Sequence, residues 1–162
     1  MRACFGFTEP VASIRLETII EAPAAACFDL SASVDAHTAS MSASGERAVG
    51  GVTSGVMRLG DTVTWRARHF GIVFRLTAVI TEHEYPSRFV DVQQRGPFRR
   101  WRHQHSFQAL EAGQTRMTDD VEFQSPLGLL GRAVDRLVLG RYLTRVLQQR
   151  NAWLRQTLES RS

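Results

Sequence analysis

The stretch WRHQHSFQALEAGQTRMTDDVEF, residues 101–123, decides the fold, because it contains two neighbouring strand patterns. In residues 101–110, aromatic and histidine side chains alternate with Arg, Gln and Ser, and residues 115–123 repeat the alternation. Large side chains at every second position indicate a strand with one buried face. The short connection through residues 111–114 predicts that the two strands form a β-hairpin.

The register of this hairpin follows from its two apolar faces. Bringing both faces to the same side of the sheet requires a loop with an odd number of residues, which places His105 opposite Asp119 and His103 opposite Val121. A two-residue turn would place His105 opposite Asp120 and turn the two apolar faces in opposite directions. We therefore predict that His105 lies beside Asp119. The two inward sets are Trp101, His103, His105 and Phe107, and Met117, Asp119, Val121 and Phe123.

The same strand pattern continues upstream of the hairpin. Pro23 opens an alanine-rich segment that predicts a short helix to about Ser33, and a second short helix is expected from Asp35 to Ser40. Short spacings between the later strands predict an antiparallel meander. The further predicted strands are residues 12–21, 48–52, 62–70, 74–82 and 89–95.

A long helix is predicted downstream, from Pro126 to about Glu159. Apolar residues recur there every three or four positions, so one stripe faces the sheet, and the arginines lie mostly off it. One helix is too narrow to fill the concave face of a long curved sheet, so an internal pocket is expected. The predicted stripe is Leu130, Val134, Leu137, Gly140, Leu143, Leu147, Asn151, Leu154 and Leu158.

Length and composition fit one globular domain. The 162 residues suffice for a single core, and 43% apolar with 22% charged residues argues against a disordered chain. All 20 basic residues are arginine, and they are spread over nearly every segment. An arginine cluster with Phe98 and Trp101 at residues 95–102 could stack single strands, but a solvated hairpin rim is favoured. We therefore expect no nucleic-acid partner.

The sequence also bears on location. Two cysteines occur without a C-x-x-C pattern, which fits a reducing compartment. No segment approaches the about 20 apolar residues of a membrane span, and the N-terminus has no apolar stretch of signal-peptide length. We expect a cytoplasmic protein without integral membrane association, and its oligomeric state stays open.

Three segments, DTVTWRARHFG (61–71), RFVDVQQRGPFRRWRHQHSF (88–107) and TRMTDDVEFQSPLGLLG (115–131), carry a family resemblance. With the order of predicted elements, they resemble the helix-grip SRPBCC superfamily, which contains START-related lipid-transfer domains, birch-pollen-allergen-like proteins and polyketide cyclase/dehydrases. They look like the bacterial cyclase/dehydrase-like branch. The resemblance covers about residues 13–159 and implies one SRPBCC-like domain over residues 1–162.

The implied fold class is α+β. A curved antiparallel sheet of about six to seven strands wraps around the long C-terminal helix, and two short helices follow the first strand. The superfamily holds carriers, receptors and enzymes, so the fold does not fix the function and no catalytic residue is transferred from it.

The histidines of the hairpin suggest chemistry. A histidine held by a carboxylate in a partly apolar pocket can act as a general acid or base, which makes His105, Asp119 and His103 candidate catalytic residues. A satisfied polar network beneath the long helix is the alternative. His37 would lie at a pocket entrance or be exposed at a helix end. Candidate pocket walls are Trp65, His69, Phe74, Leu76, Trp101, Phe107, Met117, Leu137 and Tyr142.

The pair His103-x-His105 also begins a cupin-type metal motif. The next acid is Glu111 and no histidine follows it, so the motif is incomplete and we expect neither a metal nor another cofactor. The leading hypothesis is a protein that binds a small hydrophobic molecule, such as a lipid, a polyketide or an isoprenoid-like metabolite. The alternatives are a polyketide cyclase/aromatase or dehydratase that uses His105 and Asp119, and a ligand-free interaction or stress-linked module.

Overall fold

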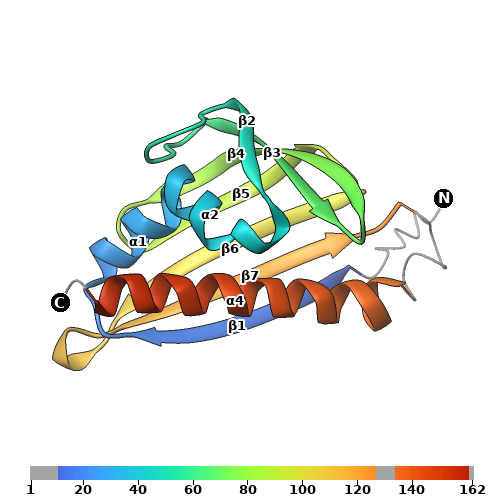
Figure 1. Ribbon diagram of the computed structural model, residues 1–162. Helices are drawn as coiled ribbons and strands as arrows, with labels where there is room; N and C mark the ends of the chain where they lie inside the picture. Colours follow the sequence, from blue (N-terminus) through green and yellow to red (C-terminus); the bar gives the residue numbers. More distant parts are fainter. Residues whose placement is uncertain (1–10, 127–133, 161–162) are drawn as a thin grey trace, which may run out of the picture.

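Seven strands form one curved antiparallel sheet in the computed structural model, which describes residues 11–126 and 134–160 (Figure 1). The order across the sheet is β1-β7-β6-β5-β4-β3-β2, so consecutive strands from β2 to β7 form a meander and the first strand pairs with the last. The strands are β1 (Ala12–Ile20), β2 (Arg47–Gly51), β3 (Thr62–His69), β4 (Ile72–Glu84), β5 (Arg88–Arg95), β6 (Arg100–Ala109) and β7 (Thr115–Gln124).

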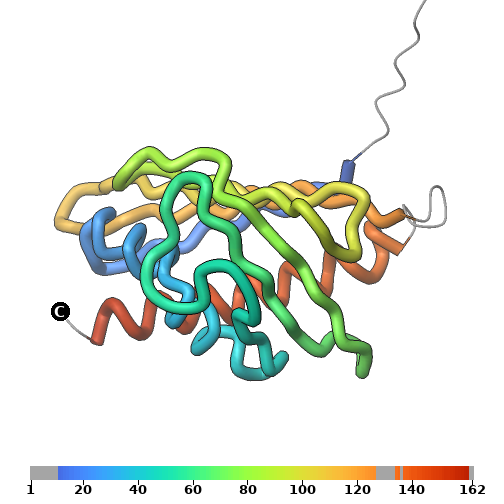
Figure 2. Tube along the Cα trace, turned by 90° about the horizontal axis from the view of Figure 1, so that it is seen from above, coloured from blue at the N-terminus to red at the C-terminus, as the bar shows by residue number. Residues whose placement is uncertain are grey.

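The helices lie together on one face of this sheet (Figures 1 and 2). Helices α1 (Ala24–Ala32) and α2 (Val34–Ser40) follow β1, and α4 (Gly140–Glu159) runs along β1 and β7. Ser33 caps α2, because its hydroxyl accepts a hydrogen bond from the Ala36 N–H at 3.2 Å. The predicted α+β helix-grip architecture, with two short helices after the first strand, is confirmed.

The register predicted for the last hairpin is also confirmed. In the β6–β7 ladder, His105 lies opposite Asp119 and His103 lies opposite Val121. The connection contains an odd number of residues, 110–114, with Ala112 in the left-handed conformation at φ 59°. Both apolar faces therefore point toward the helices.

The core lies between the sheet and the helices. Phe28 of α1 is 1% exposed and belongs to the larger buried cluster, together with Leu154 and Leu158 of α4. A smaller cluster surrounds Phe123 and Leu147. Four rings contact the Phe28 ring, at centroid distances of 5.1–5.5 Å; they belong to His83, Tyr85, Phe89 and Phe107.

The predicted stripe of the C-terminal helix is wrong at Leu137, whose side chain is 61% exposed. Residues Asp135–Leu139 form a π-helical turn ahead of α4. A π turn contains an extra residue, so a spacing of three or four no longer identifies the buried face. Leu130 and the predicted start of the helix after Pro126 lie outside the described residues.

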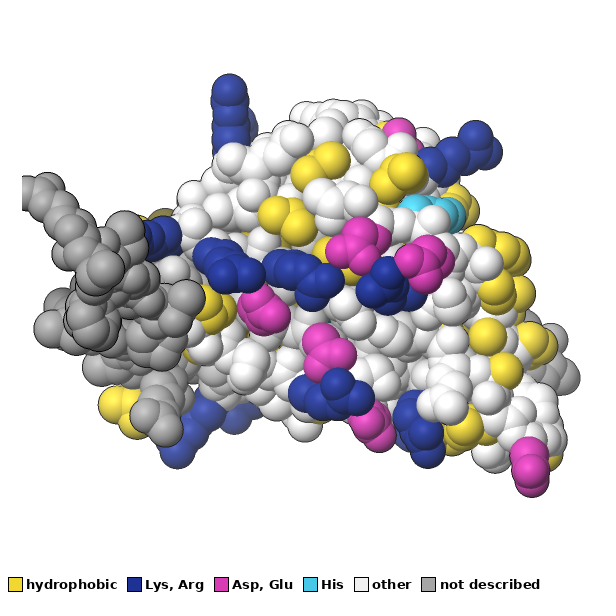
Figure 3. All heavy atoms as spheres, turned by 180° about the vertical axis from the view of Figure 1, so that it is seen from behind, with side chains coloured by type: hydrophobic (Ala, Val, Ile, Leu, Met, Phe, Trp, Pro, Cys, Tyr) yellow, Lys and Arg dark blue, Asp and Glu magenta, His cyan; other side chains and the backbone are white. Residues whose placement is uncertain are grey.

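Arginine and acidic side chains are interspersed over the outer face of the sheet (Figure 3). Arg100 pairs with Glu122 at 3.1 Å and Arg102 with Glu82 at 3.5 Å. These two arginines of the predicted hairpin rim thus lie on a mixed-charge surface. Exposed pairs of this kind contribute about 0–1 kcal/mol each. Among the helices of residues 11–126 and 134–160, none is both long and apolar enough to cross a bilayer.

A candidate ligand-binding cavity

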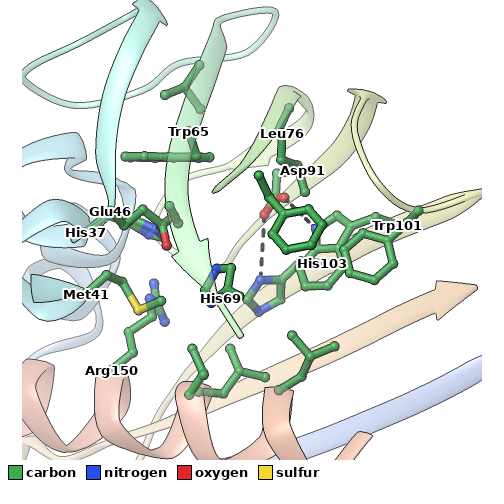
Figure 4. A pocket seen from close by; sticks show the side chains of 18 of the residues that line it. His37, Met41, Glu46, Trp65, His69, Leu76, Asp91, Trp101, His103 and Arg150 are labelled. Atoms are coloured by element: carbon green, nitrogen blue, oxygen red, sulfur yellow. Dashed lines mark hydrogen bonds and ion pairs between the residues drawn. The ribbon is translucent and has the colours of Figure 1, made fainter. Parts of the chain in front are cut away.

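A cavity of about 440 Å³ lies between the concave face of the sheet and the helices (Figure 4). Its volume falls in the range of about 300–1,000 Å³ that is typical of small-molecule sites. Strands β3 and β4 contribute Trp65, Ala67 and Leu76 to the wall, and α4 contributes Leu143 and Leu147. The side chains of these five residues are apolar or aromatic. The greater part of the cavity wall can therefore contact the hydrocarbon part of a ligand.

The structure brings most of the predicted wall residues together, but not all. Phe107 and Met117 are 5% and 0% exposed and belong to the core rather than to the cavity. They have the predicted inward parity, but α1 covers their end of the sheet, where the Ser31 hydroxyl lies 3.7 Å from Met117 Sδ. Leu137 lies on the surface because of the π-helical turn. The predicted residues that do line the cavity are Trp65, His69, Phe74, Leu76, Trp101 and Tyr142.

Two histidines form part of the polar end of the cavity. His103 and His105 project from the same face of β6, and their ring centroids are 3.8 Å apart. His103 Nε2 lies 2.9 Å and His105 Nδ1 lies 3.0 Å from Oδ1 of Asp119. Asp119 is 0% exposed and lies behind the rings, outside the cavity lining. Phe89 stacks on His105 at 4.2 Å and fixes the plane of its ring.

Asp91 completes this polar group from β5, where it lies opposite His103. Its Oδ2 is 3.4 Å from His105 Nε2 and 3.8 Å from His103 Nδ1, and its Oδ1 accepts a hydrogen bond from the Trp101 indole N–H at 3.3 Å. Sequence reasoning missed Asp91. The sequence did carry a signal for it. Asp91 lies two positions after Phe89 in the segment FVDV, residues 89–92, so both side chains point to the same, buried face of the strand.

Arg150 and Asn151 reach the same group from α4. Arg150 was predicted among the arginines lying mostly off the stripe, which is wrong, because it is 3% exposed and lines the cavity. Its guanidinium nitrogen Nη1 is 3.6 Å from Oδ1 of Asp119, and the Asn151 amide donates to Oδ2 of Asp119 at 2.7 Å. Both residues are buried because Asp119 provides their partner.

The charges of the group follow from these contacts. Burial raises the pKa of Asp119, but the hydrogen bond from His103, the close contact with His105 and the charge of Arg150 outweigh burial and hold this pKa well below its ordinary value. Burial likewise raises the pKa of Asp91, but contacts with the histidines outweigh it and lower this pKa. Burial and the neighbouring His105 lower the pKa of His103. Two ionised carboxylates therefore flank a histidine that favours its neutral form.

A second polar group lies across the cavity (Figure 4). His37 Nε2 is 2.9 Å from Glu46 Oε1, and the His37 ring stacks on Trp65 at 4.1 Å. The hydroxyl of Tyr142 lies 2.6 Å from His69 Nδ1, and burial together with the charge of Glu46 raises the pKa of Tyr142. His37 thus lines the cavity, while Glu46 was not identified from the sequence.

The arrangement combines apolar walls with hydrogen-bonding groups at two places. Such a site can hold a hydrocarbon body and orient an oxygen atom of the ligand. The catalytic role of His103, His105 and Asp119 stays a prediction, although the structure brings the three side chains together.

Comparisons with known proteins were made for the sequence and for the fold. The sequence matches no protein-family model and no curated protein. The Zhui aromatase/cyclase from Streptomyces sp. R1128 has a similar structure, with a TM-score of 0.75, 14% identity and coverage of 94% of this chain and 96% of that one. A START superfamily protein from Mycobacterium smegmatis gives a TM-score of 0.70 with 11% identity, over 93% and 99% of the two chains.

A plant protein has the same architecture. Ginseng major latex-like protein 151 from Panax ginseng gives a TM-score of 0.67 with 10% identity, over 91% of this chain and 97% of that one. At these identities the likeness concerns the fold. The chain therefore has the helix-grip fold of these proteins, as the resemblance to the SRPBCC superfamily implied.

Proposed function

We propose that this protein binds a small, largely apolar molecule, such as a lipid, a polyketide or an isoprenoid-like metabolite, in the cavity beneath α4. The cavity of about 440 Å³ with its apolar wall carries the proposal. Each methylene group that leaves water for such a wall contributes about 0.8 kcal/mol. The polar groups around His105 and Tyr142 would orient an oxygen-bearing end of the ligand.

The cavity also bears on the two alternatives. A ligand-free interaction module would favour a solid core, in which side chains occupy this space. A cyclase or dehydratase needs the same cavity to hold its substrate, so a test of binding is common to that alternative and to a carrier. The cytoplasm stays the predicted location.

Filling the cavity tests the proposal. Ala67 is 7% exposed and lines the cavity from β3, so Ala67→Phe places a phenyl group in the ligand space. We expect the affinity for 8-anilinonaphthalene-1-sulfonate, a fluorescent probe with apolar rings and one sulfonate group, to fall at least about tenfold, which corresponds to about 1.4 kcal/mol. Fluorescence titration measures this, and circular dichroism checks that the variant folds, since overpacking costs about 1–3 kcal/mol.

The matched control is Arg68→Phe, which places the same side chain at the next position of β3, on the outer face. Arg68 is exposed, and the control should keep the probe affinity within about twofold of the wild type. Equal probe binding by the two variants would show that the probe does not enter the cavity. Organic extraction of the natively purified protein, followed by mass spectrometry, then identifies the natural ligand.

A further inference from the structure

Three electron-pair donors face one another at the cavity wall. Asp91, His103 and His105 each offer one ligand atom, and these three atoms all lie within 4.8 Å of one another. Oδ2 of Asp91 is 3.8 Å from His103 Nδ1 and 3.4 Å from His105 Nε2. All three residues line the cavity, whereas Asp119 lies behind them. The donors therefore converge at a place that a solute in the cavity can reach.

The other nitrogen of each ring is engaged by Asp119. A neutral imidazole has one N–H donor and one acceptor nitrogen. His103 Nε2 forms a hydrogen bond of 2.9 Å with Oδ1 of Asp119, so we assign the N–H of that ring to this side; His105 Nδ1 lies 3.0 Å from the same oxygen, but not in hydrogen-bond geometry. The second nitrogen of each ring then faces Oδ2 of Asp91, at 3.8 Å for His103 and 3.4 Å for His105, so a cation among the three groups could bind all of them.

The surrounding side chains hold the donors in orientation. Oδ1 of Asp119 faces both rings, and the Asn151 amide binds its Oδ2 at 2.7 Å, which fixes the carboxylate. The Trp101 indole binds Oδ1 of Asp91 and leaves Oδ2 toward the histidines. A carboxylate behind a metal-binding histidine that accepts its second N–H is a recurrent feature of metal sites.

From this geometry we infer that Asp91, His103 and His105 form a binding site for a divalent transition-metal ion. Ligands that share one zinc ion at about 2.0–2.2 Å are about 3.0–3.5 Å from one another. The separation of 3.4 Å between Asp91 Oδ2 and His105 Nε2 lies in this range, and that of 3.8 Å between Asp91 Oδ2 and His103 Nδ1 lies slightly above it. No metal was expected from the sequence, because the cupin-type motif is incomplete after His105, and Asp91 was not identified.

Two imidazoles and one carboxylate favour Zn²⁺ or Fe²⁺ over Mg²⁺ or Ca²⁺, which prefer oxygen ligands. Three protein ligands leave further coordination positions free, as in metal sites that also bind a solute. Because the three donor residues line the cavity, an oxygen atom of a bound molecule could take one of these positions. The inference goes beyond the proposed function, because the ion can bind whether or not an apolar ligand does.

Titration of the untagged, chelator-treated full-length protein tests the inference. Calorimetry with Zn²⁺ should show one ion bound per chain, and Co²⁺ should give visible absorption bands typical of a site with nitrogen and oxygen ligands. His103→Gln and Asp91→Asn should each weaken Zn²⁺ binding at least about 100-fold. Asp119→Asn, behind the rings, should weaken it about 10–100-fold. Mg²⁺ should show no comparable binding.

His83→Gln is the matched control, since it removes a histidine of β4 that lies outside the group of three donors and should leave Zn²⁺ affinity unchanged. Wild-type protein that binds neither Zn²⁺, Co²⁺ nor Fe²⁺ stoichiometrically would overturn the inference, whether or not a variant folds. Equal Zn²⁺ affinity in the wild type and in folded His103→Gln or Asp91→Asn would also overturn it. The histidines would then form a hydrogen-bonded network without an ion, and probe binding in the cavity would be unaffected.

Discussion

Replacing Asp119 by alanine is expected to lower the free energy of unfolding by about 3–5 kcal/mol. The carboxylate is 0% exposed and faces His103, His105, Arg150 and Asn151. Its removal leaves the buried guanidinium of Arg150 without its carboxylate and the His103 imidazole without its acceptor. Urea unfolding, followed by circular dichroism, measures the change.

The neighbouring Asp120 provides the control for this prediction. Its side chain points to the outer face of β7 and pairs with the exposed Arg15 at 3.1 Å. Asp120→Ala should therefore cost less than about 1 kcal/mol. A loss of similar size in both variants would mean that Asp119 is not the buried centre of the polar group.

Phe28→Ala is expected to cost about 3–5 kcal/mol as well, for a different reason. Phe28 is 1% exposed, and its ring contacts four aromatic rings of the sheet and its β4–β5 connection. Alanine leaves a cavity at the junction between α1 and the sheet, because rigid strands cannot close around the lost ring. Thermal and urea unfolding of the variant measure the effect.

Phe70→Ala serves as the matched comparison, since it deletes the same ring from a side chain that is 61% exposed. Phe70 contacts Tyr142 alone among the aromatic rings of the described residues, at 4.6 Å. We expect a change below about 1 kcal/mol. If the two phenylalanine variants lost equal stability, α1 would not pack on the sheet as the structure shows.

The β6–β7 hairpin could be predicted because it is local. Its two strands follow each other directly, so parity and an odd loop length sufficed to place His105 beside Asp119. Placing Asp91 beside the histidines requires a second register, that between β5 and β6. In addition, a charged side chain in a strand is ordinarily expected on the solvent-exposed face. An inward-facing Asp91 is plausible only once His103 and His105 are known to be its partners.

Other differences arise from packing between distant segments. Arg150 has helical spacing to Leu147 and Leu154, but a buried arginine is plausible only once a buried carboxylate is known on another element. Parity placed Phe107 and Met117 on the inner face, but it does not say where α1 covers the strands. The exposure of Leu137 follows from a π-helical turn, which the apolar period did not reveal.

The three tryptophans allow the most direct test of the cavity as a binding site. Trp65 and Trp101 line it, whereas Trp153 packs against the core and does not. Nuclear magnetic resonance of the ¹⁵N-labelled protein resolves one indole signal for each. On titration with 8-anilinonaphthalene-1-sulfonate, the signals of Trp65 and Trp101 should shift and that of Trp153 should not. Probe binding that leaves Trp65 and Trp101 unchanged, or no probe binding at all, would contradict the proposed ligand-binding cavity.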